Sequence, residues 1–198
     1  MADTGVKYPA TVSTVLETGD DNDWVTPAEV ISDNGVYGNI TAASFDANDL
    51  SYLLRATNPS MGVPAGATID GIVVEIERKE TGNHTLTFPH DAAVRIVKAD
   101  GSIGTTNKGD LLTAYPSTDT YASYGGSSVL WGTTWAYSDI NDSTFGVVIS
   151  GNIVAGGVGA DAFVDHIRIT ITYTLPSGSP QVQIRSGQIE VKSGNLII

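Results

Sequence analysis

The chain has 198 residues, no cysteine, and a formal net charge of −12 from 22 acidic and 10 basic side chains. This length allows one domain with an appendage, and the lack of cysteine excludes disulfides, thiolate metal sites and a cysteine nucleophile. The acidic balance argues against binding to nucleic acid or to an anionic membrane surface, because both attract clustered Lys and Arg. The chain is rich in Thr, Ser, Gly and Asn, as expected for short strands joined by tight turns.

The first residues, Met1 to Gly5, contain neither a basic segment nor an apolar core, so the sequence predicts no secretory signal. No window approaches the ~18 consecutive apolar residues of a membrane helix. We therefore expect a soluble, disulfide-free, acidic protein made in a cytoplasm.

Helix signals are nearly absent along the chain. Residues 42–54 have two interpretations: Ser44 or Asp46 caps a short helix, or residues 51–54 form a buried strand, which we favour. Residues 72–79 alternate between apolar and charged side chains, the period of a half-buried strand. The apolar face carries Ile72, Val74 and Ile76, and the wet face carries Glu75, Glu77 and Lys79.

Further strands are predicted at 84–88, at 92–98 with Val94 and Ile96 inward, and at 145–149 with apolar side chains on both faces. Between them, residues 104–132 contain few apolar side chains, so we expect long loops there that carry Tyr115, Tyr121 and Tyr124.

The clearest strand is 163–173, which is rich in β-branched residues. Asp165 interrupts its apolar row. Glycine and proline turn signals separate all these segments, which indicates an antiparallel sandwich or barrel. One face of the 163–173 strand should carry Phe163, Ile167, Ile169, Ile171 and Tyr173, and the other Val164, His166, Arg168, Thr170 and Thr172.

A boundary follows Tyr173, where residues 175–180 form a polar hinge containing two prolines. Beyond the hinge, the sequence repeats a short strand-like unit that ends in Ser-Gly. A Ser-Gly dipeptide between two such units indicates a hairpin turn. Such short strands cannot bury a core alone, so we expect an ordered arm that needs a partner, with a passive tail or an added edge of the sheet as alternatives. The predicted oligomerisation or attachment interface is Val182, Ile184, Ile189, Val191, Leu196 and Ile198.

The sequence contains no recognisable catalytic or cofactor motif. His84, His90 and His166 lack the spacing of metal ligands, and Asp165 and His166, as neighbours on a strand, should point to opposite faces and form no dyad. We predict no enzyme, no catalytic residue, no metal ligand and no cofactor.

Two further groups of residues admit a binding role. The acidic segments 20–23 and 139–142 offer oxygen ligands for calcium, but without the spaced loop pattern we favour solvated loop carboxylates. Asp139 and Asn141 could equally form side-chain-to-backbone turns. Trp24, Trp131 and Trp135 could form a sugar-stacking platform, but we favour core and loop anchoring, since Trp is usually mostly buried.

Read together, several stretches resemble jelly-roll-like domains of tailed-phage virion proteins, namely head decoration (cement) proteins and tail or fibre proteins. The resemblance covers residues 24–173. The matching stretches are 63–72, then 130–132 with Trp135 close behind, 139–142, 145–147 and 164–167.

This resemblance implies a jelly-roll β-sandwich domain, residues 1–175, followed by an arm, residues 176–198. It implies a structural virion protein, made in the host cytoplasm, that stabilises the capsid as a decoration or cement protein. Its partners would be its own copies, as a trimer, and the major capsid protein or another virion protein. Asp165 would be a buried or turn-pairing carboxylate. Alternatives are a tail-fibre or receptor-binding module for a host glycan, and a carbohydrate-binding module of an enzyme.

Overall fold

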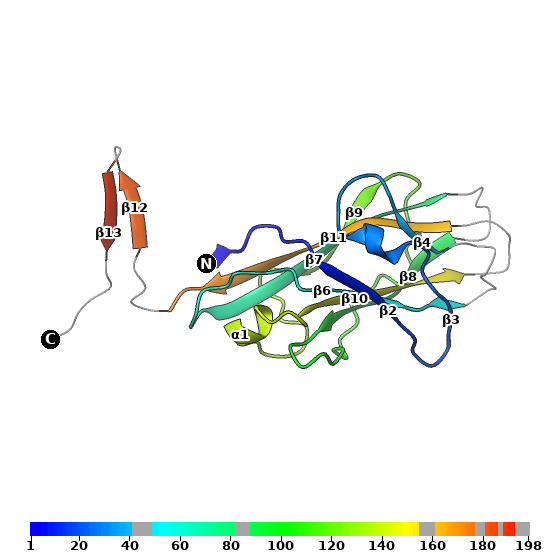
Figure 1. Ribbon diagram of the computed structural model, residues 1–198, viewed down its shortest axis with the longest axis horizontal. Helices are drawn as coiled ribbons and strands as arrows, with labels where there is room; N and C mark the ends of the chain where they lie inside the picture. The colour runs from blue at the N-terminus through cyan, green and yellow to red at the C-terminus, as the bar shows by residue number, and fades with distance from the viewer. Residues whose placement is uncertain (41–48, 82–87, 155–160, 177–180, 186–187, 193–198) are drawn as a thin grey trace.

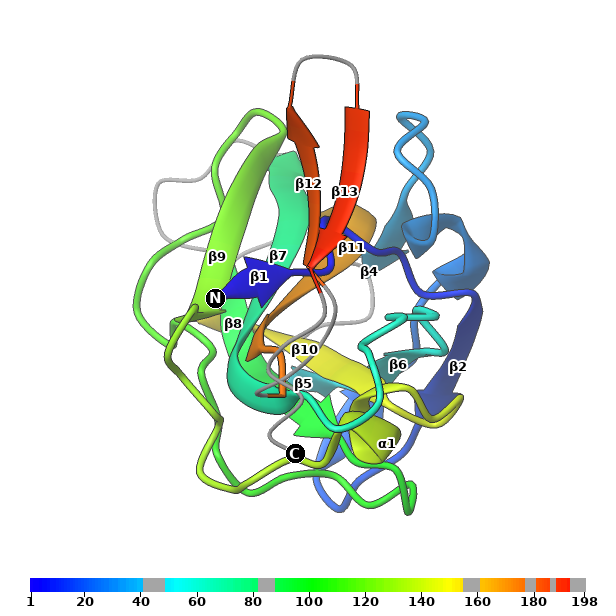
Figure 2. The same ribbon diagram turned by 90° about the vertical axis from the view of Figure 1, so that its left-hand side faces the viewer.

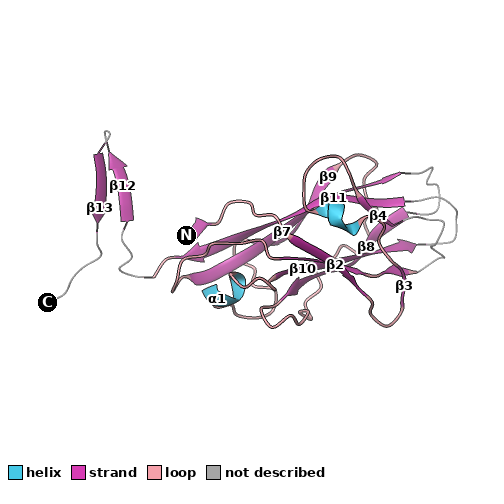
Figure 3. Cartoon of the chain, in the orientation of Figure 1, coloured by secondary structure: helices cyan, strands magenta, loops and turns pink. Residues whose placement is uncertain are grey.

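The computed structural model describes residues 1–40, 49–81, 88–154, 161–176, 181–185 and 188–192. These residues form an all-β, jelly-roll-like sandwich of two sheets, with one short 3-10 helix, η1 (Pro27–Val30), and one short α-helix, α1 (Tyr137–Ile140) (Figures 1 and 3). Among the described residues, no helix is long and apolar enough to cross a membrane.

The first sheet, here the β7 sheet, is ordered β9–β7–β11, with β1 and β4 pairing along β11. Its pairs are all antiparallel. The bounds are β1 (Ala2–Asp3), β4 (Gly38–Ile40), β7 (Thr68–Thr81), β9 (Thr120–Gly126) and β11 (Asp161–Thr174).

The second sheet, here the β10 sheet, has β8 on one side of β10 and the broken strand β5–β6 on the other, with β2 beside β6 and β3 beside β5. Only the short pair β3–β5 is parallel among the described pairs. The bounds are β2 (Thr11–Val15), β3 (Asp20–Asn22), β5 (Leu50–Ser51), β6 (Leu53–Thr57), β8 (Phe88–Val97) and β10 (Gly146–Val154).

The two sheets enclose one apolar core. Figure 2 shows the strands of the two layers, viewed from the side of the N-terminal strand β1. The apolar side chains predicted to alternate in β7 and β8 do point inward, because one face of each strand packs on this core. The outer face of the β10 sheet holds a second, smaller cluster, so the segment 145–149, predicted to be apolar on both faces, is buried on both of them. The core includes Ile72, Val74, Ile76, Val94, Ile96, Val147, Ile149, Ile167, Ile169 and Ile171, and the outer cluster is Leu53, Ala93, Val97 and Val148.

A buried ion pair links the sheets. Arg78 of β7 donates to Asp91 of β8, and the exposed fractions of these residues are 5 % and 2 %. The Asp91 carboxylate also accepts hydrogen bonds from the hydroxyls of Tyr124 (2.7 Å) and Tyr115 (3.2 Å) and from the amide of Asp110 (2.8 Å). The Asp91 carboxylate is thus hydrogen-bonded on several sides, and its ion pair with Arg78 joins the two layers.

The predicted faces of β11 are only partly right. Ile167, Ile169 and Ile171 are buried as expected, but Phe163 is not in their row. In the ladder with β7, Val164 lies opposite Arg78 and Ile167 opposite Ile76, so two residues of β11 face Glu77 alone. This β-bulge reverses the alternation, and Ala162 and Val164 fill the core in place of Phe163.

Two other expectations need correction. Residues 104–132 are not loops throughout, because residues 120–126 form β9 along the edge of β7, with Tyr124 buried. The segments 84–88 and 92–98 were predicted as separate strands, but β8 runs without a break from Phe88 to Val97, with a bulge opposite Ser150 and Gly151. Residues 84–87 lie outside the described part. In the segment 42–54, Leu50–Ser51 and Leu53–Leu54 are strand, as favoured, and residues 42–48 are not described.

At the C-terminus, β12 (Gln181–Arg185) and β13 (Gln188–Lys192) form an antiparallel hairpin. Arg185 pairs with Gln188, and the predicted Ser-Gly turn at residues 186–187 lies outside the described residues. Among the described strands, this hairpin pairs with neither sheet of the sandwich (Figure 1). The third unit, with Leu196 and Ile198, lies outside the described residues, and the division of the chain at residue 176 stays a prediction.

Candidate functional site

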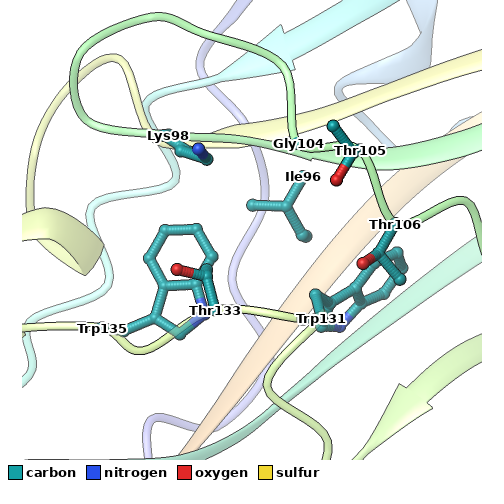
Figure 4. A pocket seen from close by; sticks show the side chains of 9 residues that line it. Ile96, Lys98, Gly104, Thr105, Thr106, Trp131, Thr133 and Trp135 are labelled. Atoms are coloured by element: carbon teal, nitrogen blue, oxygen red, sulfur yellow. The ribbon is translucent and has the colours of Figure 1, made fainter.

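Two adjoining hollows, of about 130 and 240 Å³, open around Trp135 at the end of β8. We call them together the Trp135 pocket, and Figure 4 shows the smaller of the two. Both are lined by Lys98, Thr133 and Trp135. The smaller also contacts Ile96, Gly104, Thr105, Thr106, Trp131 and Gly132, and the larger Ala99, Asp100, Thr134 and Asp139.

One wall of the pocket is the segment that follows β8. A tight turn at Gly101, with φ of 82°, sends the chain back along the edge of β8. The amide of Gly104 then donates to the carbonyl of Ile96 (2.8 Å), and that of Lys108 to Val94 (2.9 Å). This pairing holds the Thr105 and Thr106 side of the pocket against the sheet.

The other wall is the turn through residues 130–136. Trp131 and Gly132 both have left-handed backbone, with φ of 56° and 77°. A methyl group on Gly132 would collide with the hydroxyl of Thr106, so glycine lets the two walls approach. The strained Trp131 is held by burial and by its indole Nε1, which donates to the carbonyl of Ile72 (3.0 Å).

The three tryptophans divide between core and pocket. Trp24 and Trp131 are 5 % and 4 % exposed, so the prediction that they anchor the core is confirmed. Trp135 is only partly buried: its Nε1 donates to the carbonyl of Leu130 (2.9 Å) and its ring packs edge-on to Phe145 at 5.8 Å. In Figure 4 the indoles of Trp131 and Trp135 lie on either side of Ile96, and Trp135 borders both hollows.

Polar groups surround this indole. The lining residues include four threonines, Lys98, Asp100 and Asp139. Hydrogen bonds from Ser102 lower the pKa of the exposed Asp100 carboxyl below its ordinary value. The pocket therefore combines an aromatic surface with hydrogen-bond donors and acceptors.

Side chains of both acidic segments accept hydrogen bonds from nearby backbone amides; for Asp139 this is the turn alternative left open, and for Asp20 it was not predicted. Asp20 accepts a bond from the amide of Glu17, Asp139 from that of Ala136, and Asp142 from that of Thr144. Asn141 exchanges two hydrogen bonds with the backbone of Val63. Within the described part of the chain, neither segment contributes to a group of converging metal-ligand atoms.

Asp165 and His166 contradict the expectation that they point to opposite faces. The bulge buries both on one side, at 3 % and 0 % exposed, next to Glu77 of β7 and Asp33 of the loop after η1. The Nδ1 atom of His166 lies 3.2 Å from Glu77 Oε2 and 3.9 Å from Asp165 Oδ2. We call these four residues the bulge cluster.

Asp165 matches its expected structural role. Its carboxylate accepts bonds from the amides of Asn34 (3.5 Å) and Gly35 (3.3 Å), so it is a buried, turn-pairing group. Burial, together with the charges of Asp33 and Asp165, raises the pKa of Glu77 above its ordinary value, while His166 opposes that rise. These carboxylates thus crowd one another.

The bulge cluster offers no activated nucleophile within the described residues. The hydroxyl that bonds His166 there, at 2.6 Å from Nε2, belongs to Tyr121. Burial raises the pKa of that phenol to about 12, so it stays protonated at neutral pH. His90 is a buried structural residue whose Nδ1 contacts the carbonyl of Asn152 (3.0 Å), and His84 lies outside the described residues.

No protein-family model matches the sequence, and no curated protein matches it significantly. Among solved structures, the chain is similar to the CBM22-1 xylan-binding domain of Paenibacillus barcinonensis Xyn10C, with 10 % identity over 86 % of this chain and 95 % of that one, and a TM-score of 0.34. It is also similar to the carbohydrate-binding module CBM6cm-2 of Cellvibrio mixtus lichenase 5A in complex with cellotriose (14 % identity, 85 % and 97 % covered, TM-score 0.29).

A third similar structure is a crystal structure with a xylogluco-oligosaccharide (18 % identity, TM-score 0.39), in which the match covers 84 % of this chain but 38 % of that one. At such identities and TM-scores these likenesses give no ground for assigning a function. The fold rests on the two sheets described above.

Proposed function

We propose that the chain is a non-catalytic recognition protein whose sandwich binds a neutral oligosaccharide at the Trp135 pocket. The observation that carries the proposal is the partly exposed indole of Trp135, set between two hollows and surrounded by threonine hydroxyls. The C–H face of a sugar ring stacks on such an aromatic surface, and its hydroxyls hydrogen-bond to polar side chains around it.

Size and charge support this class of ligand. Each hollow is smaller than the roughly 300–1,000 Å³ of a site for a drug-sized ligand, so the ligand would be one or two sugar rings lying across both. The net charge of −12 and the carboxylates of Asp100 and Asp139 disfavour an anionic sugar. A receptor-binding module for a host glycan, one of the alternatives from the sequence, would work in this way.

Binding of the full chain to an array of neutral oligosaccharides, followed by calorimetry with the best ligand, tests the proposal. Trp135→Ala should weaken binding about tenfold or more, because a tenfold loss corresponds to the ~1.4 kcal/mol expected of an aromatic contact. Val12→Ala is the matched control, since Val12 is also partly buried against the core but lies on β2, across the β10 sheet from β8.

Unchanged affinity of the folded Trp135→Ala variant would refute the pocket. Equal losses in both variants would show that lost stability, and not lost stacking, is the cause.

We propose attachment to a larger assembly as a second candidate function, and the observation behind it is the hairpin β12–β13. Among the described strands each of its strands pairs only with the other, so each keeps an outer edge whose backbone groups can add a further strand. We propose that this hairpin is an attachment arm, through which copies form a trimer or bind the major capsid protein or another virion protein. The protein would then reside in the virion as a decoration or cement protein.

Deletion of residues 176–198 separates the two candidates. The truncated protein should keep sugar binding but lose its oligomeric state in light scattering and its attachment to particles. An unchanged oligomer that still attaches to particles would refute the arm, including the interface predicted at Val182, Ile184, Ile189, Val191, Leu196 and Ile198.

A further inference from the structure

The bulge cluster brings together ligand atoms of the kind that hold a metal ion. Asp33, Glu77, Asp165 and His166 each offer one ligand atom, and these atoms all lie within 4.8 Å of one another. Carboxylate oxygen and imidazole nitrogen bind Zn²⁺ tetrahedrally at about 2.0–2.2 Å, so neighbouring ligand atoms are about 3.3–3.6 Å apart. The Nδ1 atom of His166 already lies 3.2 Å from the Glu77 carboxylate and 3.9 Å from that of Asp165, and side-chain movements of about 1 Å would bring the other ligand atoms to this spacing.

The buried Nδ1 atom of His166 lacks the partner that such a nitrogen normally has. His166 is 0 % exposed, and its Nδ1 has no hydrogen-bond partner, because Glu77 Oε2 at 3.2 Å is close but not aligned for a bond. Buried polar atoms in native structures are nearly always satisfied. This orphaned nitrogen lies against the carboxylates of Glu77 and Asp165, where a cation would bridge them.

The other ring nitrogen has the partner that a ligating histidine needs. A metal bound at Nδ1 requires the proton on Nε2, and the Tyr121 hydroxyl, 2.6 Å from Nε2, can accept it. The ring is also held by Tyr121, edge-on at 5.2 Å, and by Tyr8 at 5.7 Å. The imidazole is thus oriented before any ion arrives.

No Lys or Arg among the described residues forms an ion pair with the carboxylates of the bulge cluster, so the imidazole of His166 is the basic group beside them. The basic groups nearby serve other acids: Arg168 bonds Glu75 at 2.8 and 3.1 Å, and Lys79 bonds Asp119 at 3.1 Å. Asp33 is exposed, which leaves an entry path from solvent.

We infer that the bulge cluster is a binding site for one first-row divalent cation, such as Zn²⁺, that ties the loop after η1 to the β7 sheet. The imidazole donor favours Zn²⁺ over Ca²⁺, which prefers a shell made wholly of oxygen. The role is structural: the ion would fix Asp33 onto the bulge that the amides of Asn34 and Gly35 already reach.

Calorimetric titration of the untagged, chelator-treated full chain with Zn²⁺ and with Ca²⁺ at neutral pH tests the site. We expect one Zn²⁺ per chain and weaker binding of Ca²⁺. Asp33→Asn and Glu77→Gln, which keep side-chain volume, should each weaken Zn²⁺ binding by about tenfold or more. Asp119→Asn is the matched control, a nearby acid outside the bulge cluster, and should leave the affinity within about twofold.

Nitrogen NMR of the His166 ring gives a second readout that does not depend on a variant folding. Zn²⁺ should shift Nδ1 and leave Nε2 protonated. The absence of saturable binding at millimolar Zn²⁺, equal affinity in all variants, equal affinity for Ca²⁺, or an unmoved Nδ1 would each overturn the site.

Discussion

Asp91→Ala should be severely destabilising, because Asp91 is the acceptor at the centre of the contact between the two sheets. It is 2 % exposed and accepts bonds from Arg78, Tyr115, Tyr124 and the Asp110 amide. Removing the carboxylate leaves the buried guanidinium of Arg78, which is 5 % exposed, without its counter-charge. The loss of one partner of a buried ion pair costs about 3–5 kcal/mol of folding stability. Asp91→Asn keeps the shape and should cost less, about 1.5–3 kcal/mol for a lost charged hydrogen bond.

Urea unfolding followed by circular dichroism measures both free energies. The double variant Arg78→Met with Asp91→Leu replaces the pair by apolar side chains and should recover much of the stability, since the unpaired charge is gone. A loss below about 1 kcal/mol for Asp91→Ala would refute the idea that this carboxylate balances a desolvated cation. A double variant no more stable than Asp91→Ala would refute it as well.

Three other predictions concern single groups. Burial and, to a smaller extent, the charge of Asp91 raise the pKa of the Tyr115 and Tyr124 phenols above their ordinary value. The unfolded chain therefore loses these protons at a lower pH than the folded chain does. The free energy of unfolding should accordingly fall as pH rises above about 10. Tyr124→Phe should flatten that fall in urea unfolding at stepped pH, and an identical slope would contradict it. Gly132→Ala should lower stability by about 1–2 kcal/mol through its left-handed φ, whereas an unchanged melting temperature would show that the turn relaxes freely. Asp165→Ala should lower the free energy of unfolding of the chelator-treated protein by about 1–3 kcal/mol, measured by urea unfolding. An unchanged free energy would mean that the turn at residues 34–35 does not need the Asp165 carboxylate.

The strands with one buried face were predictable from their alternation. In β7 and β8 the residues that alternate in the sequence are those that fill the core, because a sandwich buries one face of each strand. β9 was missed because most of its residues, including Ser123, Gly125 and Gly126, are small or polar and only its two tyrosines are large. It forms since the edge of β7 offers unpaired backbone groups, which no side-chain pattern reveals.

The bulge cluster was missed for a related reason. Strict alternation through 163–173 separates Asp165 from His166, and a single extra residue in the ladder brings them together. The sequence does contain a sign of the bulge. The buried apolar residues have even numbers at Ala162 and Val164 and odd numbers from Ile167 onward, and Asp165 lies where this change occurs. Glu77 and Asp33 come from other segments, and only the fold places them at the bulge.

At the Trp135 pocket, the sequence identified the tryptophans and left two roles open. Which indole remains accessible depends on the left-handed turn at Trp131 and Gly132, and residues 131 and 132 alone do not specify it. The approach of Thr106 to that turn joins segments far apart in the chain, so the hollows themselves could not be predicted.

The most direct test of the recognition function follows the indole N–H signals of the three tryptophans by NMR during titration with the best array sugar. Each indole has its own carbonyl partner, on Tyr52 for Trp24, Ile72 for Trp131 and Leu130 for Trp135, so the signals report on separate places. Binding at the Trp135 pocket predicts a saturable shift of the Trp135 signal with that of Trp24 unmoved. A sugar that binds while the Trp135 signal stays fixed, or a protein that binds no sugar on the array, would contradict the account.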